Sequence, residues 1–125
     1  MSEPTTTDDA SAGSPHHAID YVELSARDLP AARAFYEQAF DWTFVEYGPD
    51  YVGIQGDGRE QGGIAVGAAP PLVQLYSDDL DATLAAVRAA GGTITVEPFD
   101  FPGGRRFAFV DPAGNQLGVW TAASE

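Results

Sequence analysis

The chain has 125 residues, a formal net charge of −13 and no cysteine. This length supports one hydrophobic core of ordinary size. The acidic excess repels nucleic-acid phosphates and anionic lipids, so neither nucleic-acid binding nor membrane binding is expected. Without cysteine there is no disulfide, thiol nucleophile or thiolate metal ligand. No segment is long and apolar enough to span a bilayer, and a cytoplasmic location is expected.

The first 18 residues are polar and small, which predicts a disordered tail before a single domain over residues 19–122. His16 and His17 are the only histidines and stand at the end of this tail. A histidine pair can bind a metal, but no third ligand lies nearby in the sequence, so a solvated tail end is expected. The excess of acidic residues is consistent with a protein from a salt-rich cytoplasm, or with the amino-acid bias of a high-GC coding sequence.

The first half predicts a strand, a capped helix and three more strands. Residues 19–26 alternate in part between apolar and polar, which is typical of a strand. Asp28 precedes a stripe of apolar residues at helical spacing, and Pro30 suits the first helical turn. The further strands are expected over residues 43–47, 51–55 and 62–68, the last of them rich in glycine.

The second half predicts the same order. A strand over residues 72–77 is followed by Asp79 as the cap of a helix over 80–90, which ends at Gly91-Gly92. Strands are then expected over residues 93–98, 105–110 and 116–121, with a Pro/Gly loop from Asp100 to Gly104 before the middle one.

These two halves are copies of one another. The segment that begins at Tyr21 aligns with the segment that begins at Leu72, with identical residues at six positions: Val22/Val73, Leu24/Leu75, Asp28/Asp79, Leu29/Leu80, Ala31/Ala82 and Ala34/Ala85. Such a repeat is one supersecondary unit that cannot bury its apolar face alone. The sequence therefore predicts an α+β fold of two βαβββ modules, residues 19–68 and 72–121. Their mixed sheets should curl around a cup, with the helices outside.

From Tyr21 to Trp120 the chain resembles the vicinal oxygen chelate superfamily, also called the glyoxalase/bleomycin-resistance/dioxygenase superfamily. The resemblance rests on Tyr-Val-Glu-Leu with Asp28-Leu, on Ala-Ala-Gly-Gly after the second helix, on Phe-Pro-Gly-Gly-Arg-Arg-Phe, and on Asp-Pro-Ala-Gly-Asn with Trp120 near the end. It implies the fold but not the reaction, because members include lyases, isomerases, dioxygenases, transferases and antibiotic-sequestering proteins.

The resemblance also implies where a divalent metal would be held, by His or carboxylate side chains in the cup. Transferred onto this chain, the first-strand ligand falls on Tyr21, its equivalent in the second half on Leu72, and the last-strand ligand on Gly118. The strand over residues 62–68 has no His, Asp or Glu, although Glu60 lies just before it. The usual donors are imidazole and carboxylate. No metal cofactor is therefore expected, and a divalent metal held by displaced ligands is the alternative.

Glu23 is the candidate that could replace metal chemistry. It shares a strand face with Tyr21, two residues away. Gln74 occupies the matching repeat position, which favours placing both polar residues inside the cup. A partly buried carboxylate has a raised pKa that suits a general base, and Glu23 is the candidate catalytic residue. The alternative is a Glu with a structural hydrogen bond or a salt bridge.

Two further groups complete the predicted ligand-binding set. Arg105 and Arg106 are adjacent in a chain with few cations, and strand alternation sends one of them into the cup, to pair with an anionic group or with Glu23. The alternative for both is surface charge balance. Aromatic residues suit pocket walls, and Phe99 and Phe101 in the Pro/Gly loop are expected at its rim. The predicted ligand-binding residues are Tyr21, Glu23, Gln74, Phe99, Phe101, Arg106, Phe107 and Trp120.

Two functions are consistent with these features. The first is a small-molecule-binding protein of this superfamily without the usual metal site. The second is a lyase, isomerase or dioxygenase-like enzyme, either metal-dependent or using Glu23 as its base. A homodimer is expected, because half-cups are commonly completed across a dimer in this fold, and the expected partner besides a second copy is a small molecule.

Overall fold

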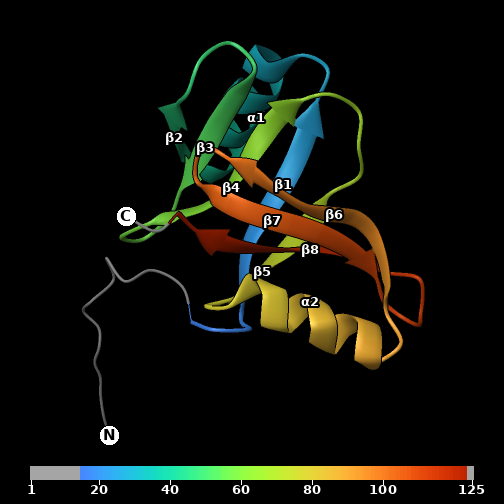
Figure 1. The fold of residues 1–125 in the computed structure, drawn as a ribbon. Helices are drawn as coiled ribbons and strands as arrows, with labels where there is room; N and C mark the ends of the chain where they lie inside the picture. Colours follow the sequence, from blue (N-terminus) through green and yellow to red (C-terminus); the bar gives the residue numbers. More distant parts are fainter. Residues whose placement is uncertain (1–14, 124–125) are drawn as a thin grey trace, which may run out of the picture. The chain divides into compact units, whose positions relative to one another are not determined.

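The computed structural model describes residues 15–123 of the chain (Figure 1). They form eight strands and two helices. In chain order these are β1 (Ile19–Ala26), α1 (Leu29–Phe40), β2 (Thr43–Glu46), β3 (Tyr51–Gln55), β4 (Glu60–Val66), β5 (Leu72–Tyr76), α2 (Leu80–Ala89), β6 (Thr93–Phe101), β7 (Gly104–Val110) and β8 (Gln116–Ala122). Of the predicted disordered tail, positions 1–14 lie outside the described residues.

The chain divides into two compact units. Unit 1 contains Tyr21–Pro71, and unit 2 combines Pro15–Asp20 with the residues from Leu72 onward. Each unit has one helix followed by three strands, which confirms the predicted α+β class and the strand–helix–three-strand repeat. The predicted cup between the two sheets stays a prediction.

Unit 1 is a four-stranded mixed sheet with α1 on one face. Its strand order is β2-β3-β4-β1, in which β1 and β4 are parallel and the other pairs are antiparallel. Its core contains Leu29, Val52, Ile54 and Ile64, with Leu24, Ala26 and Tyr36 packed against them. Because side chains alternate along a strand, β1 turns Leu24 and Ala26 toward the helix and Tyr21 and Glu23 toward the other face.

Unit 2 repeats this arrangement with α2. Its strand order is β5-β8-β7-β6, again with one parallel pair, β5 and β8, and antiparallel neighbours. Its core contains Leu80, Phe107, Phe109 and Val119, with Leu75, Leu84 and Val87 packed against them. The ribbon shows α2 lying along this sheet (Figure 1). The opposite face of the sheet therefore carries Gln74, Arg106 and Trp120.

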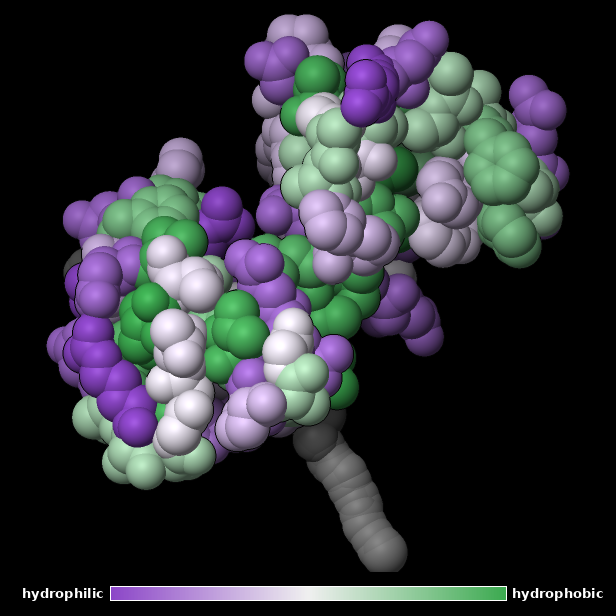
Figure 2. All heavy atoms as spheres, turned by 90° about the vertical axis from the view of Figure 1, so that its right-hand side faces the viewer, coloured by the Kyte–Doolittle hydropathy of each residue, from purple (hydrophilic) through white to green (hydrophobic). Residues whose placement is uncertain are grey.

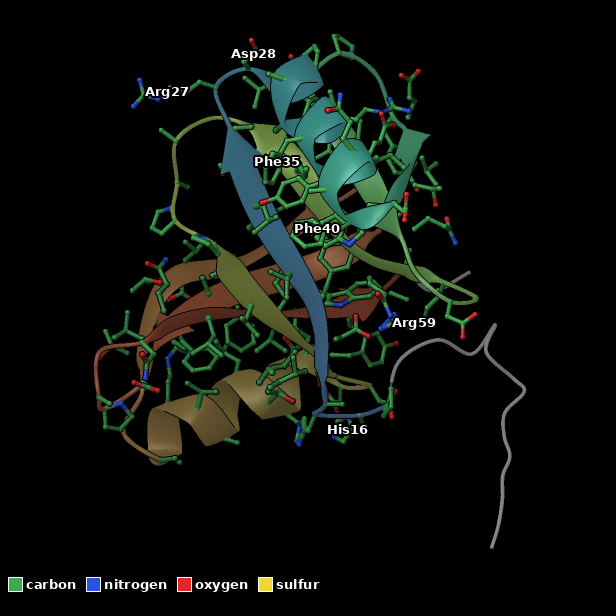
Figure 3. The ribbon with its side chains drawn as sticks, turned by 180° about the vertical axis from the view of Figure 1, so that it is seen from behind. His16, Arg27, Asp28, Phe35, Phe40 and Arg59 are labelled. Carbon is green, nitrogen blue, oxygen red and sulfur yellow. The ribbon has the colours of Figure 1, made fainter. Side chains whose placement is uncertain are left out.

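Both helices begin as the sequence predicts. The Asp28 carboxylate accepts a hydrogen bond from the Ala31 N–H at 3.0 Å, and Asp79 does the same for Ala82 at 3.1 Å. An aspartate cap satisfies one of the free amides of the first turn and stabilises a helix by about 1 kcal/mol. Asp28 is seen at the start of α1, with Arg27 directed away from it (Figure 3).

Among the strand boundaries that differ from the predictions, two change the site. Strand β4 begins at Glu60, so that residue belongs to the sheet and its side chain has a defined face. Strand β6 runs to Phe101 and joins β7 through the two residues Pro102 and Gly103. Phe99 and Phe101 are thus strand residues rather than members of a loop at a pocket rim. Antiparallel pairing of Phe99 with Arg106 extends the hairpin beyond its predicted end.

Several apolar side chains remain exposed. Phe35 and Phe40 of α1 are 56% and 58% exposed, and their rings lie edge to face at 6.2 Å (Figure 3). On the face shown in Figure 2, hydrophobic side chains lie among hydrophilic ones. In the described part of the chain, neither helix is long and apolar enough to cross a membrane.

The core position of Phe107 leads to a stability prediction. Phe107 is 1% exposed, whereas Phe99 is 40% exposed. Replacing a buried Phe by Ala removes its transfer free energy and leaves a cavity, so Phe107→Ala should cost about 3–5 kcal/mol. The control Phe99→Ala should cost roughly 1 kcal/mol or less. Urea unfolding measures both, and similar losses in the two variants would contradict this assignment.

Candidate functional site

The face of unit 1 opposite α1 carries a group of tyrosines around one carboxylate. The Tyr21 hydroxyl lies 2.5 Å from the Tyr51 hydroxyl and donates to Glu60 Oε2 at 3.0 Å. The Tyr47 hydroxyl donates to Glu60 Oε1 at 2.5 Å. Glu23 also acts on the Tyr51 phenol through its charge and hydrogen bonding. These five residues are called the phenol–carboxylate cluster below.

Two glycines make room for this cluster. Gly53 of β3 and Gly63 of β4 are direct partners across the antiparallel pair, and both are buried. A Cβ at position 53 would lie 2.5 Å from the Glu60 carboxyl carbon, and one at position 63 would collide with the Tyr51 hydroxyl. Any larger residue at either position would therefore displace the side chains of the cluster.

Burial and hydrogen bonding keep the three phenols protonated. Burial is the largest cause of a strongly raised pKa at Tyr21, followed by its hydrogen bond to Tyr51. Burial also raises the pKa of Tyr51 to about 12; the hydrogen bond with Tyr21 opposes this increase, and the charges of Glu23 and Glu60 add to it. The hydrogen bond to Glu60 is the main cause of the raised pKa of Tyr47. Each phenol is therefore a hydrogen-bond donor at neutral pH.

The raised phenol pKa values predict alkaline destabilisation. Tyrosine in the unfolded chain titrates near pH 10, so above about pH 10 the unfolded state releases protons that the folded state retains. The stabilising contribution is complete below that pH and is lost as the pH rises toward about 12. The free energy of unfolding of the wild type should therefore fall over this range.

Tyr51→Phe removes one of these groups, so its stability should fall less steeply with pH. Urea unfolding at several alkaline pH values, combined with spectrophotometric titration of tyrosinate, measures both effects. Equal slopes for the wild type and Tyr51→Phe would contradict the pKa assignment.

In unit 2, the predicted residue Gln74 is buried without a hydrogen-bond partner. It is 4% exposed, and among residues 15–123 its Oε1 has no donor within reach. The amide lies over Gly118, where a Cβ would be 3.1 Å from Oε1. A buried acceptor without a donor costs about 1–3 kcal/mol. A ligand or water molecule that donates a hydrogen bond at this point would remove that cost.

Aromatic rings surround the predicted arginine on the same face of unit 2. The Arg106 guanidinium lies 5.3 Å from the Phe99 ring centroid and 5.4 Å from that of Phe101, within the range of cation–π attraction. Trp120, the strand neighbour of Arg106, contacts Phe101 and Tyr76 through its ring. The Trp120 indole donates to Asp20 Oδ2 at 2.8 Å, which fixes its orientation.

The structure separates Phe107 from the other predicted ligand-binding residues. Phe107 points toward α2 and belongs to the core, so the expectation that it lines a ligand site conflicts with its position. Arg105 also lies on the helix side, where it pairs with Asp100 at 3.1 Å and Asp81 at 3.7 Å. The prediction that strand alternation separates the two arginines is thus confirmed. Arg106 is the one on the sheet face opposite α2.

The histidines form hydrogen bonds at the start of α2. His16 Nδ1 accepts from the Asp78 N–H at 2.8 Å, and His17 Nε2 lies 2.9 Å from the Thr83 hydroxyl. Thr83 is in turn bonded to Ser77, which is completely buried. Both histidines are exposed, in agreement with a solvated segment, and the structure adds that this segment is hydrogen-bonded to the start of α2. His16 is labelled in Figure 3.

A pocket of about 600 Å³ lies beside the first turn of α2, within unit 2. Acidic residues line it, namely Asp78, Asp79, Asp81 and Asp100, together with Arg105. The helix cap accounts for Asp79, and Arg105 pairs with two of the other aspartates. Among the predicted site residues, Phe101 alone borders this pocket, which is therefore distinct from the predicted site.

The side chains at the transferred metal positions do not suit a divalent ion. The Tyr21 phenol is already bonded to Tyr51 and Glu60, Leu72 is a hydrocarbon, and the space beside Gly118 is taken by the Gln74 amide. Between residues 15 and 123, no three or more His, Cys, Asp or Glu side chains are grouped to hold a metal. Hard or borderline cations require several such donors. This donor set does not fit the family's ion.

Sequence reasoning missed Tyr47, Tyr51 and Glu60. Tyr51 could have been found from the alternation of β3, because it shares a face with Gly53. Glu60 was placed just before its strand, so its face was not assigned. For Tyr47, no signal in the sequence indicates its contact with Glu60, because the residue follows β2 and is 58% exposed.

Comparison with known proteins identifies the family. The profile of the Glyoxalase/Bleomycin resistance protein/Dioxygenase superfamily matches residues 18–119. The chain therefore belongs to this superfamily, as its sequence motifs and the fold of its two units suggest.

Two curated relatives are 28% identical to the chain. One is a protein of Mycobacterium tuberculosis named "Putative glyoxylase CFP32", matched over 82% of this chain and 45% of CFP32. The other is the anthracycline biosynthesis protein DnrV of Streptomyces peucetius, matched over 80% of this chain and 45% of DnrV. The chain thus spans less than half the length of the curated relatives it matches.

Solved structures share the fold. The Mn(II)-bound glyoxalase of Novosphingobium aromaticivorans is 25% identical with a TM-score of 0.65, over 90% of this chain and 42% of that one. Methylmalonyl-CoA epimerase of Mycobacterium tuberculosis is 15% identical with a TM-score of 0.70, over 90% of this chain and 92% of that one. At 15% identity the epimerase indicates the fold alone.

Proposed function

We propose that this protein binds a small organic molecule and does so without the metal site of its superfamily. The observation that carries the proposal is Gln74, whose buried Oε1 has no donor among the described residues. An unpaired buried acceptor is expected where a ligand supplies the missing hydrogen bond.

Other residues on the same sheet face as Gln74 support a ligand with a flat portion. Phe99, Phe101 and Trp120 supply aromatic surface on the same sheet face, and Arg106 is held between two of these rings. Small-molecule sites typically combine aromatic walls with a few polar groups of this kind. The relative DnrV is named for anthracycline biosynthesis, and a flat ring system on this face of the protein agrees with that name.

Gln74→Met tests whether the side-chain amide of Gln74 binds a ligand or stabilises the fold. Methionine has a similar length but no polar group, so it removes the unpaired acceptor. The unliganded variant should be as stable as the wild type or more stable, by about 1 kcal/mol. Compounds that raise the melting temperature of the wild type in a screen of small metabolites should bind the variant at least about tenfold more weakly.

Gln116→Met serves as the control for this test. Because Gln116 is exposed on β8, the change should alter neither the stability of the protein nor its affinity for the compounds. The proposal would be contradicted by a Gln74→Met protein that loses stability while retaining its affinity for every compound found with the wild type.

A second candidate function is catalysis with Glu23 as a general base. The observation in its favour is that Glu23 acts on the phenol of Tyr51, so a carboxylate and protonated phenols lie on the same face of unit 1. Such a pair could remove a proton from a bound substrate and donate one back. Hydrogen bonds from two phenols already occupy acceptor sites on both oxygens of Glu60.

Glu23→Gln tests this candidate. If the protein catalyses proton transfer on a ligand found in the screen, hydrogen–deuterium exchange at the ligand's acidic carbon should fall about 100-fold or more in the variant. Ligand affinity should change little, because glutamine retains the shape of the side chain. Glu46→Gln, an exposed change on β2, is the control. Exchange at the wild-type rate in Glu23→Gln would exclude the role of base.

A further inference from the structure

The phenol–carboxylate cluster of unit 1 has used all of its own hydrogen-bond donors. A protonated phenol has one proton to give. Tyr47 gives its proton to Glu60, and Tyr21 gives its proton to Glu60 or Tyr51. Tyr51 bonds to Tyr21 or to Glu23. In either arrangement, each of the three protons is directed at an oxygen atom within the cluster.

What remains in the cluster is acceptor capacity. An ionised carboxylate offers about four lone-pair sites, and the phenols occupy two of those on Glu60. The phenol oxygens also keep lone pairs. The raised pKa values of the phenols prevent them from losing protons at neutral pH. A ligand group therefore has to donate hydrogen bonds in order to be bound here.

The charge of Glu60 adds a second requirement. Within residues 15–123, the partners of its carboxylate are the neutral phenols of Tyr21 and Tyr47, and it forms no ion pair. The side chain is half-buried, and partial burial strengthens the attraction of its charge for a cation. The two nearby glycines hold this arrangement open, since any side chain at Gly53 would displace the carboxylate.

We infer that the phenol–carboxylate cluster binds a protonated primary amine on the ligand. An ammonium group has three N–H donors and no acceptor, which complements a site that only accepts. It also supplies the positive charge that Glu60 lacks. A carboxylate or phosphate would be repelled, and a divalent metal would need several more oxygen donors. The rings of Tyr47 and Tyr51, 6.1 Å apart, add cation–π attraction.

Tyr47 is the most exposed of the three phenols, at 58%, while Tyr21, Tyr51 and Glu60 are half-buried. This inference rests on the proposed small-molecule function and names the ligand group that unit 1 would recognise. It assigns roles to Tyr47, Tyr51 and Glu60, which the sequence did not single out as site residues.

Three probes with a common ring test the inference, namely benzylammonium, benzyltrimethylammonium and phenylacetate. The first has a charge and N–H donors, the second a charge without N–H donors, and the third the opposite charge. Each is titrated into ¹⁵N-labelled full-length protein at constant ionic strength and followed by NMR. Benzylammonium should bind with a Kd on the order of 1–10 mM, as expected for a fragment. The shifted amides should include those of Gly53 and Gly63.

The other two probes should bind at least about tenfold more weakly. Glu60→Gln should weaken benzylammonium binding about tenfold or more, because the amide keeps the shape of the side chain but removes the charge. Tyr47→Phe keeps the charge and should bind within about threefold of the wild type. Glu46→Gln, a change to a carboxylate that is paired with Arg33 on β2, should have no effect.

Equal affinity for benzyltrimethylammonium or for phenylacetate would overturn the inference, as would shifts that leave Gly53 and Gly63 unaffected. These comparisons use the wild type and hold even if Glu60→Gln fails to fold. A wild type that prefers none of the three probes would overturn the inference, while the proposed small-molecule function would stand if Gln74→Met weakens the binding of a ligand found in the screen.

Discussion

The structure depends on the burial of one face of each sheet under a single helix. In a four-stranded sheet only alternate side chains can reach that helix, and here they are the leucines, isoleucines, valines and phenylalanines of the two cores. The remaining side chains on the same strands are thereby assigned to the opposite face. This assignment places Tyr21 and Glu23 in unit 1, and Gln74, Arg106 and Trp120 in unit 2, where a ligand could contact them.

The sheet face opposite the helix differs in chemistry between the two units. The face of unit 1 presents carboxylates held by neutral phenols, and the face of unit 2 presents an amide and a guanidinium among aromatic rings. The family resemblance places a metal ligand at Tyr21, and a phenol at neutral pH donates a hydrogen bond where a metal ligand would have to offer a lone pair. Here the Tyr21 phenol is instead part of a hydrogen-bonded network with Tyr51 and Glu60.

Much of this arrangement could be predicted from the sequence because it follows from local rules. The repeat, the aspartate caps and strand alternation fix the order of elements and the faces of Glu23, Gln74 and Arg106. Strand alternation places Phe107 and its neighbour Arg106 on opposite faces, so the two predicted site residues cannot both face a ligand, and Phe107 is the one in the core. The partners of Glu60 could not be predicted, because they depend on the register between β3 and β4 and on the end of β2.

The segment Pro15–Asp20 has a consequence for how the chain is assembled. It belongs to unit 2, where the Tyr76 N–H donates to the Ala18 carbonyl and the Trp120 indole donates to Asp20, yet it precedes Tyr21–Pro71 of unit 1 in the sequence. Unit 1 is therefore inserted into unit 2. A ribosome must synthesise the whole of unit 1 before the segment can meet its strand partners. A fragment that starts at Leu72 would lack those partners, so the boundary between the two repeats is a poor place to divide the protein.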